Sequence, residues 1–309
     1  MKHLISAKTL TKQEILAIIE RAFAMQSVQK QGKSDLLAGK IMAALFFEPS
    51  TRTRLSFETA MHRLGGSVVS TENAREFSSA VKGETLEDTI RVVSGYADVI
   101  VLRHNEIGAA ARAASVSQVP VLSAGDGAGE HPSQALLDTF TIAKELGRID
   151  DLTVGLVGDL MYGRTVHSLI YTLSQFSGIR FLCAAPSHTP LPDDLIKFAT
   201  ARGAKVEFEP DLSKVASAVD VLYQTRIQKE RFQSLEEYEV SKGLYVVDEA
   251  ILEKMPPSSI IMHPLPRAGE ITPAVDRDPR AAYFRQTHYG VPVRMALLLD
   301  SLLTTDEGV

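Results

Sequence analysis

Short runs of apolar and β-branched residues alternate with longer segments of helical periodicity, and this alternation limits the possible folds more than any other feature. Seven such runs predict strands, over residues 41–47, 98–102, 153–157, 179–184, 205–208, 219–223 and 259–262. The sequence TKQE at 11–14 predicts a capping box that opens the first helix. Strands and helices in alternation form parallel sheets covered on both faces. We predict an α/β fold of two domains, each a parallel β-sheet flanked by helices, with ligands at the carboxyl ends of the strands.

The length of 309 residues exceeds that of a usual single core and supports two domains. A boundary is expected near residues 147–151, where a helix ends at Gly147 and a new apolar strand follows. We assign residues 1–147 to the first domain and residues 148–289 to the second. The apolar helix over 290–305 is expected to pack back onto the first domain.

Charge and cysteine content exclude several classes of protein. The formal net charge of −5 argues against a general nucleic-acid surface, so a cationic cluster here indicates a local pocket for a small anion. The single cysteine, Cys183, excludes an intrachain disulfide and a cysteine-rich zinc site. No apolar signal segment and no membrane-length apolar run is apparent. A cytoplasmic enzyme or binding protein that does not bind membranes is expected.

The stretch FFEPSTRTRLSFE at 46–58 joins an apolar strand to a helix whose first turn carries hydroxyls and arginines. Unpaired amides at a helix start, hydroxyls and a guanidinium together form an anion site suited to phosphate. Arg52 and Arg54 lie roughly 200° apart around a helix, so they cannot both face one ligand. The spacing of Arg54 and Glu58 predicts an ion pair, which leaves Arg52 for the ligand. The alternative is a capped helix with solvated arginines.

The stretch GDGAGEHPSQ at 125–134 brings His131 and Gln134 to one face of a helix start. Imidazole can donate to a carbonyl oxygen and a carboxamide can hold an amide-like group, so the two residues suit a substrate that contains both. The alternative is a capping or surface histidine.

Further basic residues follow predicted strands. Arg103 follows the strand over 98–102, and Lys82 lies in a polar loop, where a solvated lysine is the usual interpretation. In the second domain, Arg164 and Arg226 indicate two carboxylate sites, because guanidinium matches carboxylate geometry. The glycine spacing of a dinucleotide-binding fold is absent after the strand over 153–157, so we expect no nucleotide cofactor.

The sequence HPLPR at 263–267 follows the last predicted strand, and its two prolines fix an extended backbone with available carbonyls. At this point the chain resembles the aspartate and ornithine carbamoyltransferase family over nearly its whole length. STRTR at 50–54 is similar to the family's carbamoyl-phosphate motif, and HPSQ at 131–134 to its His-Pro-x-Gln element. HPLPR resembles the aspartate branch, since ornithine enzymes usually carry a cysteine after that histidine.

The resemblance implies transfer of a carbamoyl group from carbamoyl phosphate to the amine of aspartate, in pyrimidine biosynthesis, without metal, cofactor or covalent enzyme intermediate. It implies catalytic roles for Arg52, Thr53, Arg103 and His131. It implies that carbamoyl phosphate is bound by Ser50, Thr51, Arg52, Thr53, Arg103, His131, Gln134, Pro264 and Leu265. It implies that aspartate is bound by Lys82, Arg164, Arg226 and Gln228. A homotrimer is implied in which Ser78 and Lys82 enter the neighbouring chain's site, and regulatory chains are a candidate partner.

Three residues depart from the family pattern. Ser133 replaces a common threonine, and Met161 stands where many relatives carry lysine. Glu130 precedes His131 and is expected to raise the pKa of its imidazole.

The sequence opposes three other functions. An ornithine enzyme is opposed by arginines at 164, 226 and 267, a nucleotide-binding oxidoreductase by the missing glycine pattern, and a non-catalytic binding module by the presence of every catalytic group.

Overall fold

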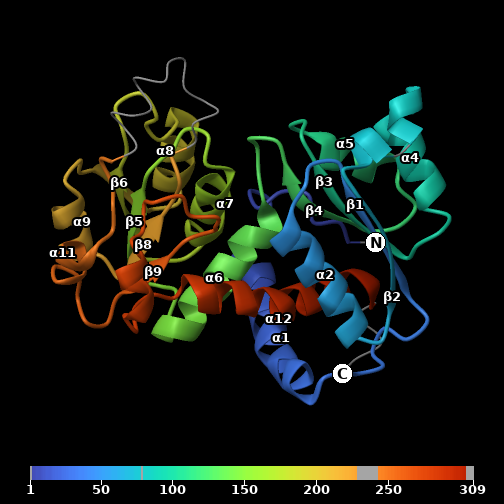
Figure 1. The fold of residues 1–309 in the computed structure, drawn as a ribbon, viewed down its shortest axis with the longest axis horizontal. Coiled ribbons are helices and arrows are strands. Elements are labelled where there is room, and N and C mark those ends of the chain that lie inside the picture. The colour runs from blue at the N-terminus through green and yellow to red at the C-terminus, as the bar shows by residue number, and fades with distance from the viewer. Residues whose placement is uncertain (1, 78, 228–242, 304–309) are drawn as a thin grey trace. The chain divides into compact units, whose positions relative to one another are not determined.

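The computed structural model describes residues 2–77, 79–227 and 243–303, and its strands form two parallel sheets (Figure 1). The first sheet has the strand order β2-β1-β3-β4, with β1 at Ile41–Phe46, β2 at Ser67–Glu72, β3 at Val99–His104 and β4 at Val121–Asp126. The second sheet has the order β7-β6-β5-β8-β9, with β5 at Thr153–Val157, β6 at Arg180–Ala184, β7 at Lys205–Phe208, β8 at Val221–Gln224 and β9 at Ile260–Met262. The predicted α/β fold and the seven predicted strands are confirmed.

Two strands of the first sheet, β2 and β4, were not predicted from the sequence, and the reasons differ. β2 is an edge strand of sequence SVVSTE whose residues are mostly accessible, so it lacks the apolar run of a buried strand. β4 is buried along its whole length, but its sequence VLSAGD ends in small and polar residues. Its backbone is completed by the N-terminal segment, which forms a parallel bridge between Leu4 and Leu122.

Helices connect the strands, as the alternating pattern predicts. The α-helices of the described residues are α1 Lys12–Gln31, α2 Thr51–Arg63, α3 Ala74–Phe77, α4 Leu86–Val93, α5 Ala109–Val116, α6 Pro132–Leu146, α7 Arg164–Leu173, α8 Asp193–Thr200, α9 Leu212–Ala218, α11 Glu249–Leu252 and α12 Tyr283–Leu302. The 3₁₀ segments within the described residues are η1 at Ser79–Lys82 and η3 at Pro273–Arg277. The capping box at Thr11 and Glu14 is present in α1, as predicted.

The last helix begins earlier than expected. Pro292 lies inside α12, which starts at Tyr283, whereas the sequence indicated a start near residue 290. An interior proline removes one backbone hydrogen bond, but burial of the flanking residues Val293 and Met295 holds the helix in the core.

The chain divides into two compact units, Met1–Phe140 with His288–Val309, and Thr141–Thr287. Both divisions fall inside helices, α6 and α12, and not in loops. The boundary at residue 147 expected from the sequence lies at the C-terminal end of α6. Within the described residues, no helix is long and apolar enough to cross a membrane.

Candidate active site

The first candidate anion-binding element is the junction of β1 and α2 in the first unit. Ser50 is the N-cap residue of α2 with extended backbone, and its hydroxyl makes no capping hydrogen bond to the helix. The hydroxyl and the first amides of α2 are therefore available to a ligand. Thr53 is buried in the first turn, and Thr51 is exposed.

Arg52 and Arg54 differ as the helix geometry predicts. Arg54 pairs with Glu58 at 3.3 Å and with Glu72 at 2.9 Å, so it ties α2 to β2. The predicted ion pair with Glu58 is confirmed. Among the described residues, no hydrogen bond or ion pair engages Arg52. Arg52 reaches the surface, yet partial burial of its guanidinium lowers its pKa.

Arg103, near the end of β3, connects the neighbouring strand ends. Its side chain is buried, and its guanidinium donates to Glu48 at 2.7 Å and to the carbonyl of Ala124 at 3.2 Å. The register between β3 and β4 shifts between Leu102 and His104, so the strand pairing is irregular at Arg103.

A tight loop after β4 positions His131. Asp126 accepts hydrogen bonds from the amide of Glu130 at 2.9 Å and from that of Gly108 at 3.0 Å. Gly127 has a φ of 53°, and a Cβ there would lie 2.6 Å from the carbonyl oxygen of Asn105, so the turn requires glycine. His131 is buried at the end of this loop, with its Nδ1 3.3 Å from the Ser133 hydroxyl.

Glu130 has a task that differs from the expected one. Its carboxylate accepts hydrogen bonds of 2.6 Å from the Ser6 hydroxyl and 2.6 Å from the Ala7 amide, which anchors the N-terminal segment. Burial raises the pKa of Glu130, and the nearby charge of Asp126 adds to this, while the hydrogen bonds oppose it. The structure thus assigns this carboxylate to the N-terminal segment instead of the His131 imidazole.

The strand order brings these groups to one edge of the first sheet. β3 lies between β1 and β4 (Figure 1). Phe46 pairs with Arg103, and His104 pairs with Asp126. Parallel strands end at the same sheet edge, so residues 50–53, Arg103 and residues 131–134 share that edge. Lys82 is exposed at the end of η1, and Ser78 lies outside the described residues.

The second unit places Arg164 and Arg226 after adjacent parallel strands. Arg164 is the first residue of α7, which follows β5, and Arg226 follows β8. The chain after β8 is held by Thr225, whose amide and hydroxyl each donate to the Val157 carbonyl at 2.8 Å. Both arginines are partly buried, and Gln228 lies outside the described residues.

A buried histidine organises the turn after β9. His263 Nδ1 accepts from the Leu265 amide at 2.7 Å, so its Nε2 carries the proton that binds Glu270, also at 2.7 Å. Leu265 has a φ of 54°, a conformation uncommon for residues other than glycine. The turn carries the backbone carbonyls of Pro264 and Leu265. Sequence reasoning missed Glu270, for which the position seven residues after His263 gives no helical or strand signal.

Arg267 contacts residues of the second unit, to which it belongs. Its guanidinium pairs with Asp276 and lies 5.6 Å from the ring centroid of Tyr283. Hydrogen bonding to Asp276 raises the pKa of Arg267 further. The use of Arg267 as a cation that opposes an ornithine side chain is therefore not supported, because its charge is already paired.

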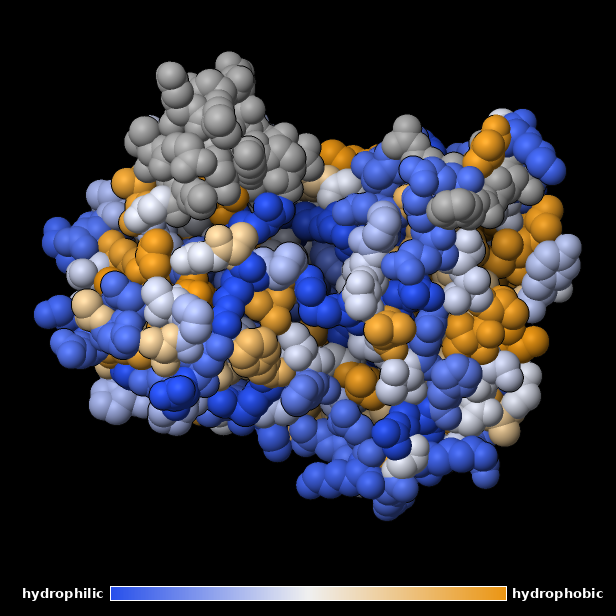
Figure 2. Space-filling model, viewed as in Figure 1, coloured by the Kyte–Doolittle hydropathy of each residue, from blue (hydrophilic) through white to orange (hydrophobic). Residues whose placement is uncertain are grey.

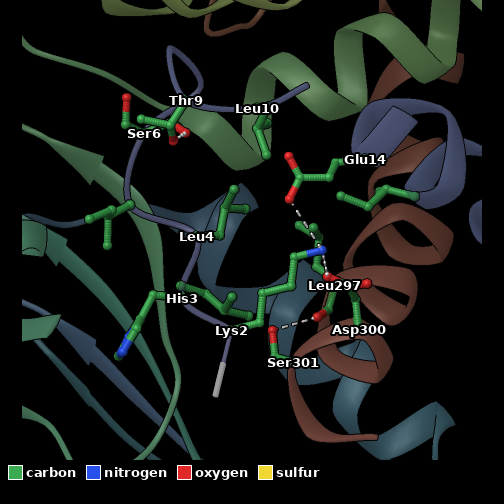
Figure 3. A pocket seen from close by; sticks show the side chains of 13 residues that line it. Lys2, His3, Leu4, Ser6, Thr9, Leu10, Glu14, Leu297, Asp300 and Ser301 are labelled. Carbon is green, nitrogen blue, oxygen red and sulfur yellow. Dashed lines mark hydrogen bonds and ion pairs between the residues drawn. The ribbon is translucent and has the colours of Figure 1, made fainter. Parts of the chain in front are cut away.

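A small cavity in the first unit lies apart from these groups. It has a volume of about 110 Å³ and is lined by the N-terminal segment, α1 and α12. Lys2 reaches into it and pairs with Asp300 at 2.8 Å and with Glu14 at 3.8 Å (Figure 3). These ion pairs show that the cavity belongs to the packing of the N-terminal segment.

Comparisons with known proteins agree with this arrangement. The carbamoyl-P binding domain of aspartate/ornithine carbamoyltransferases matches residues 2–144, and their Asp/Orn binding domain matches residues 150–300. The chain is 51% identical to the aspartate carbamoyltransferase catalytic subunit of Methanocaldococcus jannaschii, over 100% of both chains. It is 54% identical to the chloroplastic aspartate carbamoyltransferase 3 of Pisum sativum, over 95% of this chain and 76% of that one.

Solved structures give the same result. The catalytic subunit of M. jannaschii aspartate transcarbamoylase matches with a TM-score of 0.92 and 51% identity over 100% of both chains. Aspartate transcarbamoylase from Trypanosoma cruzi, in complex with carbamoyl phosphate and aspartate, matches with a TM-score of 0.92 and 45% identity, over 98% of this chain and 97% of that one. The fold and the two domain matches define a carbamoyltransferase. The chain belongs to the aspartate/ornithine carbamoyltransferase family.

Proposed function

We propose that the chain is an aspartate carbamoyltransferase, which transfers the carbamoyl group of carbamoyl phosphate to the amine of L-aspartate in pyrimidine biosynthesis. The observation that carries the proposal is the edge of the first sheet. There Arg52, without a partner among the described residues, stands at the start of α2, Arg103 lies near the end of β3, and His131 follows β4. The T. cruzi relative, whose structure holds carbamoyl phosphate and aspartate, supports this substrate pair.

The first unit suits the phosphate and the carbamoyl oxygen. The hydroxyls of Ser50, Thr51 and Thr53, the α2 amides and the Arg52 guanidinium bind phosphate in the proposal. Thr53, Arg103 and His131 donate to the carbamoyl oxygen and stabilise the oxyanion that develops there. Carbamoyl phosphate is already activated, so orientation and oxyanion stabilisation supply most of the acceleration.

The second unit suits the acceptor substrate. Arg164, Arg226 and Gln228, with Lys82 from a neighbouring chain, bind the two carboxylates of aspartate in the proposal. The backbone carbonyls of Pro264 and Leu265, with Gln134, accept hydrogen bonds from the carbamoyl amide. The neutral amine of aspartate attacks the carbamoyl carbon, the bond to the phosphate oxygen breaks, and the departing phosphate accepts a proton from the amine.

The substrate assignment is tested by phosphate release from carbamoyl phosphate in the presence of either aspartate or ornithine. We expect release with aspartate and none above background with ornithine. The guanidinium groups of the second unit match the side-chain carboxylate of aspartate and not the side-chain ammonium group of ornithine. Release with ornithine alone would place the chain in the other branch, and no release with either amine would refute the transferase assignment.

We also propose a homotrimer with shared sites, to which Ser78 and Lys82 contribute from a neighbouring chain. Lys82 is exposed and has no ion pair among the described residues. β2 lies at the edge of its sheet, and Figure 2 shows hydrophobic residues gathered over this edge. Leu55 of α2, Val69 of β2 and Val92 of α4 are each about half exposed. Exposed apolar surface of this kind is typical of a subunit interface.

The shared site is tested by mixing chains of two inactive variants, Arg52→Ala and Lys82→Ala, after dissociation. If Lys82 acts in a neighbouring chain, each mixed trimer contains one intact site and activity returns. A mixture as inactive as its parents would refute the shared site. Regulatory chains and a cytoplasmic location stay predictions, as does the assignment of residues 1–147 to carbamoyl phosphate and of 148–289 to aspartate.

A further inference from the structure

Gln134, which the proposed function assigns to the carbamoyl amide, has a buried partner on its own helix. Its Nε2 donates to Oδ1 of Asp138 at 2.7 Å. Asp138 lies one turn further along α6 and is 0% exposed. A carboxylate accepts hydrogen bonds but cannot donate them, so the Gln134 amino group must face Asp138. The carbonyl oxygen of the carboxamide is then the atom left for a ligand.

A buried arginine accompanies Asp138. Arg294 of α12 is 2% exposed, and its Nη1 donates to the Gly290 carbonyl at 3.1 Å. Its guanidinium lies 5.4 Å from the ring centroid of Phe57 in α2. Burial lowers the pKa of Arg294 to about 10, and the charge of Asp138 opposes that shift. Arg294 therefore carries its charge at neutral pH, and the charge of Asp138 acts on it.

The packing around this arginine is specific. A Cβ at position 290 would lie 2.6 Å from Nη1 of Arg294, so glycine one turn earlier on α12 provides the space for the guanidinium. Burying two charges is unfavourable compared with an apolar core of the same volume. Asp138 and Arg294 thus bury two charges that an apolar pair of similar volume would avoid, and Asp138 binds Gln134 directly.

We propose that Asp138 is a positioning residue that fixes the direction of the Gln134 carboxamide, with Arg294 as its buried counter-charge. The arrangement presents a hydrogen-bond acceptor to the ligand, which suits the NH₂ of a carbamoyl group and gives no partner to a methyl group in its place. The inference rests on the proposed function, because it concerns how that site selects a carbamoyl donor over an acyl donor.

The test compares carbamoyl phosphate with acetyl phosphate, in which a methyl group replaces the amino group. The preference is the ratio of the inhibition constant of acetyl phosphate to the KM of carbamoyl phosphate, measured at saturating aspartate. Asp138→Asn allows the Gln134 carboxamide to turn around, because asparagine can both donate and accept. We expect the preference to fall about tenfold, the effect of losing one aligned hydrogen bond.

A double-mutant cycle separates positioning from general damage. In a Gln134→Ala background, Asp138→Asn should change the preference less than twofold, because the group that it orients is absent. Thr139→Val is the matched control. It removes a buried hydroxyl that donates to the Ala135 carbonyl on the same helix, and it should leave the preference unchanged.

The outcomes distinguish the two proposals. A wild-type chain inactive with carbamoyl phosphate and aspartate overturns the proposed function. If the wild type is active and the folded Asp138→Asn variant keeps the preference for carbamoyl phosphate, the positioning role alone is overturned. The same holds if Asp138→Asn lowers this preference equally in the Gln134→Ala background. If Asp138→Asn fails to fold because Arg294 loses its counter-charge, Asp138→Asn with Arg294→Met removes both charges, and the same ratio decides.

Discussion

Arg52→Ala and Arg54→Ala remove the same side chain two positions apart on α2 and should have opposite effects. Arg54 pairs with Glu58 and Glu72, and its side chain is 22% exposed. A partly exposed ion pair contributes about 0.2–1 kcal/mol, so two pairs with the packed stem contribute about 1–2 kcal/mol. For a unit of this size, that loss lowers the Tm by about 2–8 °C. Arg52 has no partner to lose among the described residues, so its removal should change stability by less than about 0.5 kcal/mol.

The activities should follow the reverse order. Arg52→Ala should lower kcat/KM by about 10²–10³-fold, because it removes a charged donor from the proposed phosphate site. Scanning calorimetry measures the Tm, and phosphate release measures activity. Arg91→Ala is the control, since its ion pair with Asp88 is exposed on both sides and contributes little. A stable, inactive Arg54→Ala together with a destabilised Arg52→Ala would reverse the assignment and refute the helix-face argument.

Three further predictions concern titratable groups. Glu130 has a raised pKa, so its contribution to the free energy of unfolding falls as pH rises above 4.5. Glu130→Gln should reduce this pH dependence in urea titrations, and an unchanged pH profile of stability would contradict the prediction. Burial raises the pKa of Glu270, but the hydrogen bonds from His263 and a backbone amide outweigh burial, so the pKa is lowered. The contribution of Glu270 to the free energy of unfolding is therefore lost as pH falls below 4.5. Glu270→Gln should lessen the destabilisation by acid, and an equal loss of stability in acid would count against the pairing of Glu270 with His263. Burial raises the pKa of Cys183 to about 12, so the native thiol should resist alkylation that proceeds in denaturant, with mass spectrometry as the measurement.

The sequence predicts a strand best where a local apolar run indicates that the strand is buried. β1 and β5 are short, mostly apolar runs that are buried along nearly their whole length, and both were predicted from their local sequence. β2 and β4 depend on their neighbours instead. β2 pairs with β1 along its full length despite its accessible residues, and β4 is buried although serine and aspartate interrupt it. Pairing of this kind depends on tertiary contacts, which leave no hydrophobic periodicity in the local sequence.

The same distinction holds for the candidate site. The ion pair of Arg54 with Glu58 is set by helical spacing, so the sequence predicts it, while the second partner, Glu72, comes from a strand that was not predicted. Asp138 shares the helix of Gln134 at the i, i+4 spacing and could have been found by the same rule. Arg294 could not, because it lies on a helix 156 positions further along the chain and reaches Asp138 only through the fold.

Glu130 shows why proximity in sequence misleads about electrostatics. A carboxylate next to His131 in the chain was expected to act on the imidazole, but adjacent residues at a helix start direct their side chains apart. The carboxylate instead binds Ser6 and Ala7, more than 120 positions away, with two hydrogen bonds of 2.6 Å. Because the Glu130 amide also donates to Asp126, one residue joins the N-terminal segment to the loop that carries His131. Its influence on the site therefore passes through the backbone of that loop, so Glu130→Gln should change stability with pH more than it changes the pH dependence of kcat.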